Sequence, residues 1–244
     1  QKAQKEGVEL VPKRVVKVEF HQEGFQITDK DGSLYEAKVV IGAFGKRSML
    51  DKDLNRDFIN RRSPYVGVKY HLRTDEADPN AIALHNFKEG YCGISQIENE
   101  TYNLCYLTHR SNLKTHGSIE EMEDNVLKKN PFLSRILSSS DFLFEKPEVI
   151  NEITFERKEP VYNHILMTGD AAGMITPLCG NGMAMAIHGA KELCEILIES
   201  FAEGFDRDYV ESRYRSVWNN LFANRLWAGR NIQKLFGSPI ISEI

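Results

Sequence analysis

The stretch HILMTGDAAGMITPLCGNGMAMAIHGAKEL, residues 164–193, places a carboxylate, several small residues and the start of a helix close together. Asp170 directly follows an apolar run that is typical of a buried strand, and open α/β sheets bind ligands at the carboxyl ends of their strands. The small residues Ala171, Ala172 and Gly173 let a large ligand approach the backbone. The pattern therefore predicts a binding site in which a carboxylate accepts hydrogen bonds from ligand hydroxyl groups.

The second half of the stretch predicts a helix N-terminus at the same place. Pro177 stiffens the loop, and Gly180 and Gly182 free the backbone where the helix begins. The first N–H groups of a helix have no internal partners, so they favour an anion or a group that becomes anionic. A flavin meets both requirements, because its hydroxyl-bearing chain suits Asp170 and its ring gains negative charge on reduction. The alternative is an ordinary strand–turn–helix with a capping aspartate, and the combined spacing favours the flavin.

Composition excludes several other classes of function. The chain has 244 residues, of which 41% are hydrophobic and 27% charged, so it is globular and long enough for one large or two modest domains. Its net charge of −4 does not suit nucleic acid or an anionic membrane. No apolar run reaches the roughly 20 residues of a membrane span. Four cysteines and seven histidines lack disulfide-framework or zinc spacing. We expect a cytoplasmic protein without a bound metal.

Strand and helix patterns flank residues 164–193, called the Gly-Asp stretch after Gly169 and Asp170. The opening QKAQKEG reads as the end of a helix that closes on Gly7, so we expect that part of a longer protein precedes it. Alternation and apolar runs predict strands at 8–12, 14–21, 24–30 and 34–45, the last buried on both faces at VVIGAF. A second, antiparallel sheet is predicted from strands at 64–73, 81–87, 91–97 and 101–109. A capped helix at 118–130, strands at 147–156 and 164–169, and helices at 182–203 and 206–235 complete the pattern.

These elements predict an α/β (α+β) fold with three parts. Residues 1–62 and 156–203 form part of a Rossmann-like, FAD-binding domain. Residues 63–155 form an inserted antiparallel sheet that binds substrate, and residues 204–244 form a C-terminal helical segment.

The Gly-Asp stretch resembles the second flavin motif of the FAD-dependent monooxygenases built like para-hydroxybenzoate hydroxylase, a superfamily that includes geranylgeranyl reductases and flavin-dependent halogenases. The family pattern falls on Gly169, Asp170, Ala171, Ala172, Pro177, Gly180 and Gly182, and a second family stretch matches Gly42, Ala43, Gly45 and Ser48. The resemblance implies that Asp170 holds the ribityl chain and that the backbone of Gly180, Asn181, Gly182 and Met183 lies beside the flavin ring. The implied cofactor-binding residues are Gly42, Gly45, Gly169, Asp170, Ala171, Pro177, Gly180, Asn181, Gly182 and Met183.

Two departures from the family pattern bear on function. The Gly-x-Gly-x-x-Gly fingerprint of the ADP-binding βαβ unit, about a hundred residues by ordinary domain proportions, is absent. We therefore expect residues 1–244 by themselves to be inactive and to carry no stoichiometric FAD. In addition, Phe44 replaces an aspartate that the family uses near the flavin and the nicotinamide donor. Phe44 either packs under the sheet or marks a rebuilt donor site supplied by a reductase partner. Both alternatives favour a reductase-like enzyme over direct NADPH-driven aromatic hydroxylation, with NAD(P)H kept as a candidate electron donor.

Several further residues have competing interpretations. Tyr91 and Cys92 lie on the strand that crosses the substrate cavity in this superfamily, and the small Gly93 and Ser95 argue against halogenation. If Glu98 and Asn99 form a two-residue hairpin loop, Cys92 and Cys105 face one another. The favoured interpretation is that both are buried, reduced thiols. The strand residues His71, His85 and His109 are expected to be structural, and the alternative is that they face the flavin. The last-helix residues Trp218, Phe222 and Trp227 are expected to pack, and the alternative is a substrate lid.

The sequence as a whole predicts an FAD-dependent oxidoreductase that acts on a mostly apolar organic substrate, by hydroxylation or by reduction of a double bond. No catalytic acid or base is identified. The alternative is a non-catalytic module that holds a lipid-like or aromatic molecule on the same fold without flavin.

Overall fold

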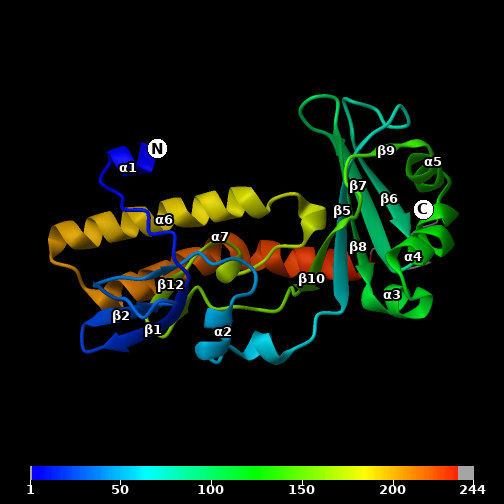
Figure 1. The fold of residues 1–244 in the computed structure, drawn as a ribbon. Coiled ribbons are helices and arrows are strands. Elements are labelled where there is room, and N and C mark those ends of the chain that lie inside the picture. Colours follow the sequence, from blue (N-terminus) through cyan, green and yellow to red (C-terminus); the bar gives the residue numbers. More distant parts are fainter. Residues whose placement is uncertain (1, 236–244) are drawn as a thin grey trace. The chain divides into compact units, whose positions relative to one another are not determined.

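The computed structural model of the protein describes residues 2–235, which form two compact units (Figure 1). The first unit comprises the chain up to Asn60, Arg157–Gly173 and Gly182–Phe222. The second comprises Arg61–Glu156, Met174–Asn181 and the chain from Ala223 onward. Of the C-terminal segment expected at 204–244, residues 207–235 form a single helix, and residues 236–244 lie outside the described residues.

A three-stranded antiparallel meander opens the first unit, in the order β1 (Val15–His21), β2 (Gly24–Asp29), β3 (Leu34–Ala37). The turn before β3 is fixed by Asp29, whose carboxylate accepts hydrogen bonds from the backbone N–H groups of Asp31 and Ser33 and from the hydroxyl of Tyr35, each 2.9 Å long. Gly32 completes the turn with a φ of +84°, a value that suits glycine.

A second small sheet of the first unit carries the strand before Asp170. Its order is β11 (Val161–Tyr162), β12 (Ile165–Met167), β4 (Ile41–Gly42), and β12 runs parallel to β4. The strand expected at 34–45 is therefore divided between two sheets as β3 and β4. Ile41 is 43% exposed, so β4 is not buried on both faces as expected. β4 forms one edge of this sheet in the described part of the chain.

Within residues 2–235, the α-helices that belong wholly or partly to the first unit are α1 (Lys2–Lys5), α2 (Met49–Asp53), α6 (Gly182–Glu203) and α7 (Arg207–Leu235). The expected strand at 8–12 is wrong: these residues pair with no strand, and Leu10 is 72% exposed. α6 has the predicted bounds and lies beside α7, where a Cβ atom on Gly189 would come within 2.5 Å of Trp218. Trp218 and Phe222 are buried as expected, whereas Trp227 is 64% exposed and does not belong to that packing.

The second unit is built on an antiparallel sheet in the order β10-β5-β8-β7-β6, with the short β9 also paired to β5. The strands are β5 (Tyr65–Arg73), β6 (Ile82–Phe87), β7 (Gly90–Gln96), β8 (Tyr102–His109), β9 (Asp141–Phe142) and β10 (Glu148–Ile153). The predicted sheet is confirmed in β5, β6, β7 and β8, each within a few residues of its expected bounds. β10 was expected as a strand, whereas β9 was not.

Helices cover one face of this sheet (Figure 1). They are α3 (Arg110–His116), α4 (Ile119–Asn125) and α5 (Pro131–Ser139), of which only α4 was expected. The side chain of Ser118 accepts a hydrogen bond from the backbone of Glu121, as the predicted N-cap requires. The buried core between helices and sheet includes Leu72, Leu104 and Leu133, each 0% exposed.

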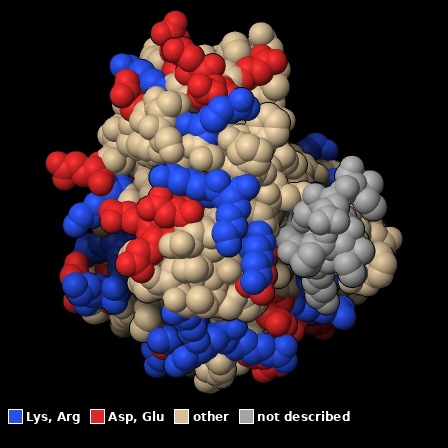
Figure 2. All heavy atoms as spheres, turned by 90° about the vertical axis from the view of Figure 1, so that its right-hand side faces the viewer, with Lys and Arg blue, Asp and Glu red and all other residues tan. Residues whose placement is uncertain are grey.

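Charge on the surface is mixed in sign. On the face drawn in Figure 2, acidic side chains are prominent at the top of the view and basic side chains at the bottom, and side chains of both signs also occur between them. Within the described residues, no helix combines the length and the apolar character needed to cross a membrane.

Candidate functional site

Two loops of the first unit start side by side at the carboxyl ends of β4 and β12. The strands pair Leu166 with Ile41 and Met167 with Gly42, and the backbone N–H of Thr168 then donates to the carbonyl oxygen of Gly42 over 3.0 Å. One loop runs through Gly45, and the other forms a turn of 3₁₀-helix at Gly169–Ala171. The paired strand ends thus form the kind of edge at which open α/β sheets bind ligands.

Glycine is required by backbone geometry in both loops. Gly45 has a φ of +82° and Gly169 a φ of +58°, and side-chain-bearing residues adopt such values only with strain. A Cβ atom on Gly169 would also lie 3.4 Å from the Cβ atom of Ala186, so α6 packs closely on this turn. These glycines therefore shape the site by bending its two loops.

Asp170 occupies the middle of the 3₁₀ turn, and its side chain is half-buried. Within the described residues its carboxylate accepts no hydrogen bond from protein groups. Burial raises the pKa of Asp170, and the positive charges of Lys158 and Lys46 oppose that shift. A desolvated carboxylate without an internal donor is suited to accept hydrogen bonds from the hydroxyl groups of a ligand. This arrangement fits the ribityl chain of a flavin.

Two buried cations that no sequence motif indicated donate hydrogen bonds to backbone carbonyl oxygens of the same turn. Arg56 is fully buried, forms an ion pair with Asp51 at 3.0 Å, and donates to the carbonyl oxygen of Ala171 over 2.9 Å. The amine of Lys158 donates to the carbonyl oxygens of Asp170 and Lys46, each over 2.7 Å. The local sequence gave no signal for either residue, because a charged residue in a loop is ordinarily exposed.

The helix that follows the Gly-Asp stretch begins at the predicted place. α6 starts at Gly182, and its second residue, Met183, is 84% exposed. The predicted site residues that belong to the first unit lie at the end of β4, in the loops after β4 and β12, and at the start of α6. They are Gly42, Gly45, Gly169, Asp170, Ala171, Gly182 and Met183.

Gly42 has a packing role in this arrangement. A Cβ atom there would lie 2.5 Å from the sulfur of Met167 and 2.9 Å from the ring of Phe44. Phe44 itself lines a largely apolar cavity of about 410 Å³, together with Val18, Leu50 and other aliphatic residues of β1, α2 and the strand β12. Phe44 is half-buried at this position, and the choice between packing and a rebuilt donor site stays a prediction.

The other predicted site residues belong to the second unit. Pro177 begins a turn of 3₁₀-helix (Pro177–Cys179), and Gly180 follows it with a φ of +59°. Leu178 of this turn packs against the buried cluster that contains Tyr91. The second unit therefore brings Tyr91 together with the loop that carries Pro177, Gly180 and Asn181.

Tyr91 and Cys92 cannot line the same cavity. Neighbouring residues of a strand point to opposite faces of the sheet. Cys92 is 0% exposed in the core under α3, α4 and α5, whereas Tyr91 belongs to the cluster with Leu107 and Phe155. A substrate on the Tyr91 face would therefore not touch the Cys92 side chain.

Cys92 and Cys105 also do not face one another. β7 and β8 pair Cys92 with Tyr106 and Gly93 with Cys105, and they are joined through residues 97–101 and not through a two-residue loop. Cys92 and Cys105 are both free thiols.

The strand histidines make structural contacts. His71 lies 4.9 Å from the ring of Phe144, and His85 stacks on Phe132 at 5.5 Å. His109 caps α3 by accepting a hydrogen bond from the backbone of Ser111. Over residues 2–235, no cluster of three or more His, Cys, Asp or Glu side chains forms a metal site.

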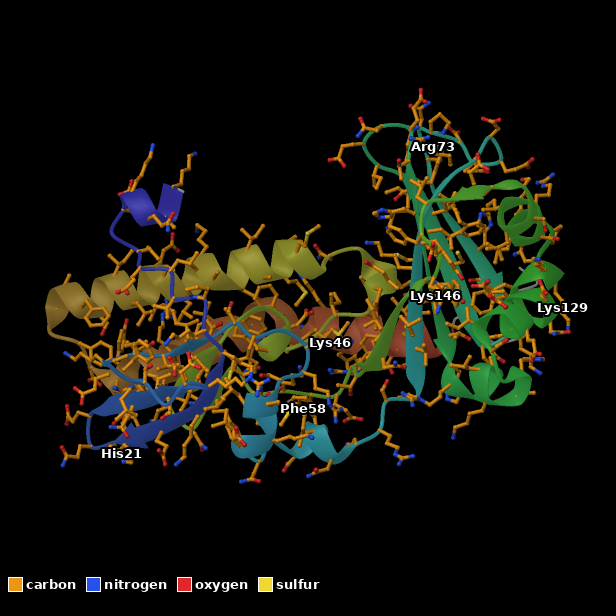
Figure 3. The ribbon with its side chains drawn as sticks, viewed as in Figure 1. His21, Lys46, Phe58, Arg73, Lys129 and Lys146 are labelled. Carbon is orange, nitrogen blue, oxygen red and sulfur yellow. The ribbon has the colours of Figure 1, made fainter. Side chains whose placement is uncertain are left out.

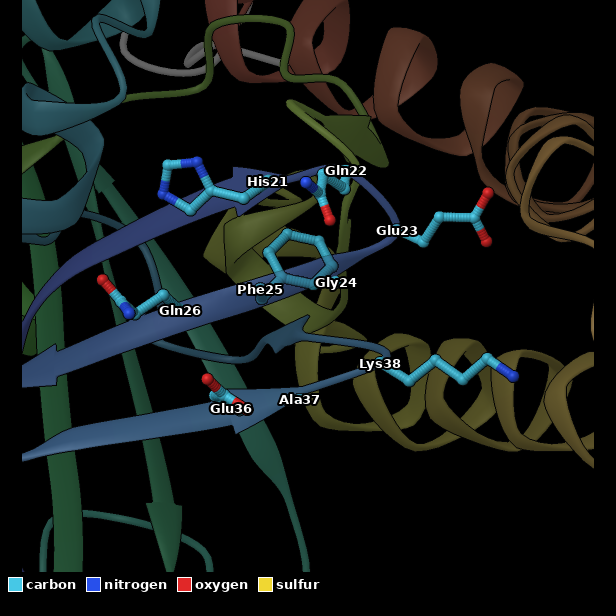
Figure 4. A pocket seen from close by; sticks show the side chains of 9 residues that line it. All are labelled: His21, Gln22, Glu23, Gly24, Phe25, Gln26, Glu36, Ala37 and Lys38. Carbon is cyan, nitrogen blue, oxygen red and sulfur yellow. The ribbon is translucent and has the colours of Figure 1, made fainter.

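A groove of about 550 Å³ lies elsewhere in the first unit, at the end of the meander (Figure 4). It is lined by His21, Gln22, Glu23, Gly24, Phe25, Gln26, Glu36, Ala37 and Lys38. None of the predicted site residues belongs to it. Arg207 donates hydrogen bonds to the carbonyl oxygens of two of these lining residues, Glu23 and Lys38, at 2.9 and 2.7 Å.

Comparison with known proteins places this site in a wider context. No protein-family model matches the chain. Conditioned medium factor receptor 1 of Dictyostelium discoideum is 26% identical over 195 residues, which are 78% of this chain and 38% of that protein. The chain thus spans about two fifths of this relative.

Solved structures give stronger evidence of fold. HpxO of Klebsiella pneumoniae, complexed with FAD and uric acid, matches with a TM-score of 0.68 at 18% identity, over 93% of this chain and 59% of HpxO. PqsL of Pseudomonas aeruginosa, a probable FAD-dependent monooxygenase, matches with a TM-score of 0.64 at 17% identity, over 92% of this chain and 64% of PqsL. CmlS, a flavin-dependent halogenase, matches with a TM-score of 0.74 at 16% identity, over 92% of this chain and 42% of CmlS. The chain therefore shares the fold of the FAD-dependent monooxygenases, over about three fifths of the length of HpxO and PqsL.

Proposed function

We propose that the chain is the larger part of an FAD-dependent oxidoreductase that acts on a mostly apolar organic substrate. The observation that carries the proposal is the carboxylate of Asp170, which is desolvated, without an internal hydrogen-bond donor, and placed beside the carboxyl ends of two parallel strands. The fold shared with proteins that bind FAD supports the choice of ligand.

The residues of the first unit would divide the work of holding the cofactor. Asp170 would accept hydrogen bonds from the ribityl hydroxyls, Gly45 and Gly169 would let the ligand approach the backbone, and the first N–H groups of α6 would face the ring. When bound, the flavin supplies the redox chemistry. The protein would position it and exclude water.

The substrate is proposed to contact the face of the inserted sheet that carries Tyr91. That face is apolar around Leu107 and Phe155, and burial raises the pKa of Tyr91, so its hydroxyl is neutral at physiological pH. Of the two reactions, reduction of a double bond is proposed ahead of aromatic hydroxylation, because Phe44 cannot replace the aspartate of the hydroxylase motif as a hydrogen-bond acceptor. NAD(P)H or a reductase partner would supply the electrons. A cytoplasmic location stays a prediction.

The absorption spectrum of the purified full-length protein tests this proposal. A yellow protein whose flavin is released by denaturation and identified as FAD is the expected result. A colourless protein that takes up no added FAD would contradict the proposal and would favour the binding module without flavin. The chain 1–244 by itself is expected to retain no stoichiometric FAD, since the ADP-binding unit is proposed to lie outside it.

A further inference from the structure

Lys158 lies between the two loops of the candidate site. Lys158 is only 6% exposed, and its amine donates to the carbonyl oxygens of Lys46 and Asp170 over 2.7 Å each. The same amine lies 4.4 Å from the centre of the Phe58 ring, which closes the space beneath it. Lys46 and Phe58 are labelled in Figure 3.

This bridge joins the loops beyond the last bond between their strands. β4 and β12 are linked up to the hydrogen bond from Thr168 to Gly42, and the two chains then continue as separate loops. Lys158 reconnects them at Lys46 and at Asp170. Since Arg56 binds the next carbonyl oxygen, that of Ala171, two consecutive peptide groups of the turn are held by buried cations.

The charge of Lys158 is not neutralised by an adjacent carboxylate. Within the described residues it forms no ion pair, whereas its neighbour Arg56 is paired with Asp51. The charged groups that face Lys158 are Asp51, Arg56 and Arg47 and, on the turn itself, Asp170. Burial outweighs the two acidic groups and lowers the pKa of Lys158 to about 8.

We propose that Lys158 is a positioning residue for the flavin: its protonated amine ties the loop at Lys46 to the turn at Asp170 and so sets where the Asp170 carboxylate meets the ribityl chain. This proposal rests on the proposed function. Lys158 acts through the backbone of the turn, and it is distinct from the residues assigned to contact the cofactor.

The proposal predicts a pH dependence with opposite signs for two quantities. Above pH 8 the amine loses its proton in the folded protein, so the bridge weakens and flavin affinity falls. The stability of the flavin-free protein changes the other way. Between about pH 8 and the ordinary lysine value of 10.5, the unfolded chain holds the proton that the folded chain has lost, so this group makes stability rise with pH. A residue needed only for folding would move both quantities together.

Three forms of the full-length protein test the proposal through the FAD dissociation constant at pH 7 and pH 9: the wild type, Lys158→Met and Lys158→Arg. Lys158→Met removes both hydrogen bonds at similar side-chain length, and we expect its affinity at pH 7 to fall by about tenfold to a hundredfold. Lys158→Arg keeps a positive charge at both pH values, so its affinity should not fall between them, whereas that of the wild type should. Lys52→Met, at an exposed lysine of α2, is the matched control and should leave the affinity unchanged.

Amide hydrogen exchange in the flavin-free protein gives a second readout. Lys158→Met should raise the exchange rates of residues 43–48 and 169–173, while those of β1 and β2 stay the same. Two results would overturn the assignment of Lys158 and leave the proposed function intact. One is an equal FAD affinity of wild type and Lys158→Met, and the other is an equal loss of FAD affinity at pH 9 in wild type and Lys158→Arg. A wild-type protein that binds no flavin would overturn the proposed function and the assignment with it.

Discussion

The hydroxyl group of Tyr214 on α7 donates a hydrogen bond of 2.7 Å to the carbonyl oxygen of Met167, the last residue of β12. Tyr214 is 0% exposed, so this bond is made in the core, where water cannot replace it. This bond fixes the strand that precedes the Gly-Asp turn to a helical residue 47 positions later in the chain.

Tyr214→Phe should lower the free energy of unfolding by about 1–3 kcal/mol, because the carbonyl oxygen of Met167 would be left buried without a donor. Urea denaturation measures this change. Tyr209→Phe is the matched control, since Tyr209 lies on the same helix and is 44% exposed. Equal stability of Tyr214→Phe and Tyr209→Phe would show that the bond contributes nothing.

Asp170→Asn should change stability and flavin binding in opposite directions. Burial raises the pKa of Asp170 above its ordinary value of 3.8, so the folded protein holds this proton more tightly than the unfolded chain. The contribution of this group to stability is therefore greatest below pH 3.8 and is lost as pH rises through the raised pKa. Near pH 7 Asp170→Asn removes the cost of a buried charge, and the flavin-free protein should become more stable.

The same substitution should weaken FAD binding by about tenfold to a hundredfold, because a charge-assisted hydrogen bond to the ribityl chain is lost. Thermal denaturation without flavin and a flavin titration at pH 7 measure the two effects. Asp53→Asn, at an exposed position of α2, should alter neither. Undiminished flavin affinity in Asp170→Asn would remove Asp170 from the site.

Gly42→Ala should destabilise the first unit by about 1–3 kcal/mol through overpacking. The added Cβ atom would lie 2.5 Å from the sulfur of Met167, so β4 and β12 would have to separate or the Met167 side chain would have to move. Gly93→Ala is the control, because the nearest atom to its added Cβ lies at an ordinary 3.5 Å. If Gly42→Ala unfolds at the same urea concentration as wild type, the first unit accommodates the added methyl group without loss of stability.

The four cysteines should differ sharply in their reaction with a disulfide reagent under native conditions. Cys179 and Cys194 are exposed and should be modified quickly, whereas Cys92 is 0% exposed and burial raises the pKa of its thiol. Mass spectrometry of the modified protein identifies the sites. Modification of Cys92 as fast as of Cys179 would contradict its place in the core of the second unit.

Local sequence patterns were sufficient for the elements whose side-chain period is regular. Apolar residues alternate with polar ones in β5, β7 and β8 and recur at helical spacing in α6. These patterns predict the elements at nearly the observed bounds, because one face of each is buried. The pattern failed at residues 8–12 and at 34–45. An apolar run there does not reveal whether a partner strand exists or to which sheet each half belongs.

The sequence by itself predicted a turn at Gly169 and Asp170 followed by a helix, and tertiary structure decided which side chains hold that turn. The Gly-Asp stretch identified Asp170, Gly169 and the start of α6, since small residues and a helix start are local signals. That Lys158 and Arg56 lie buried beneath this turn could not be predicted, because the partners of Arg56 include a carbonyl group 115 positions away. Only the packed chain brings such groups within hydrogen-bond distance, and a buried charge is recognisable only when its partners are in place.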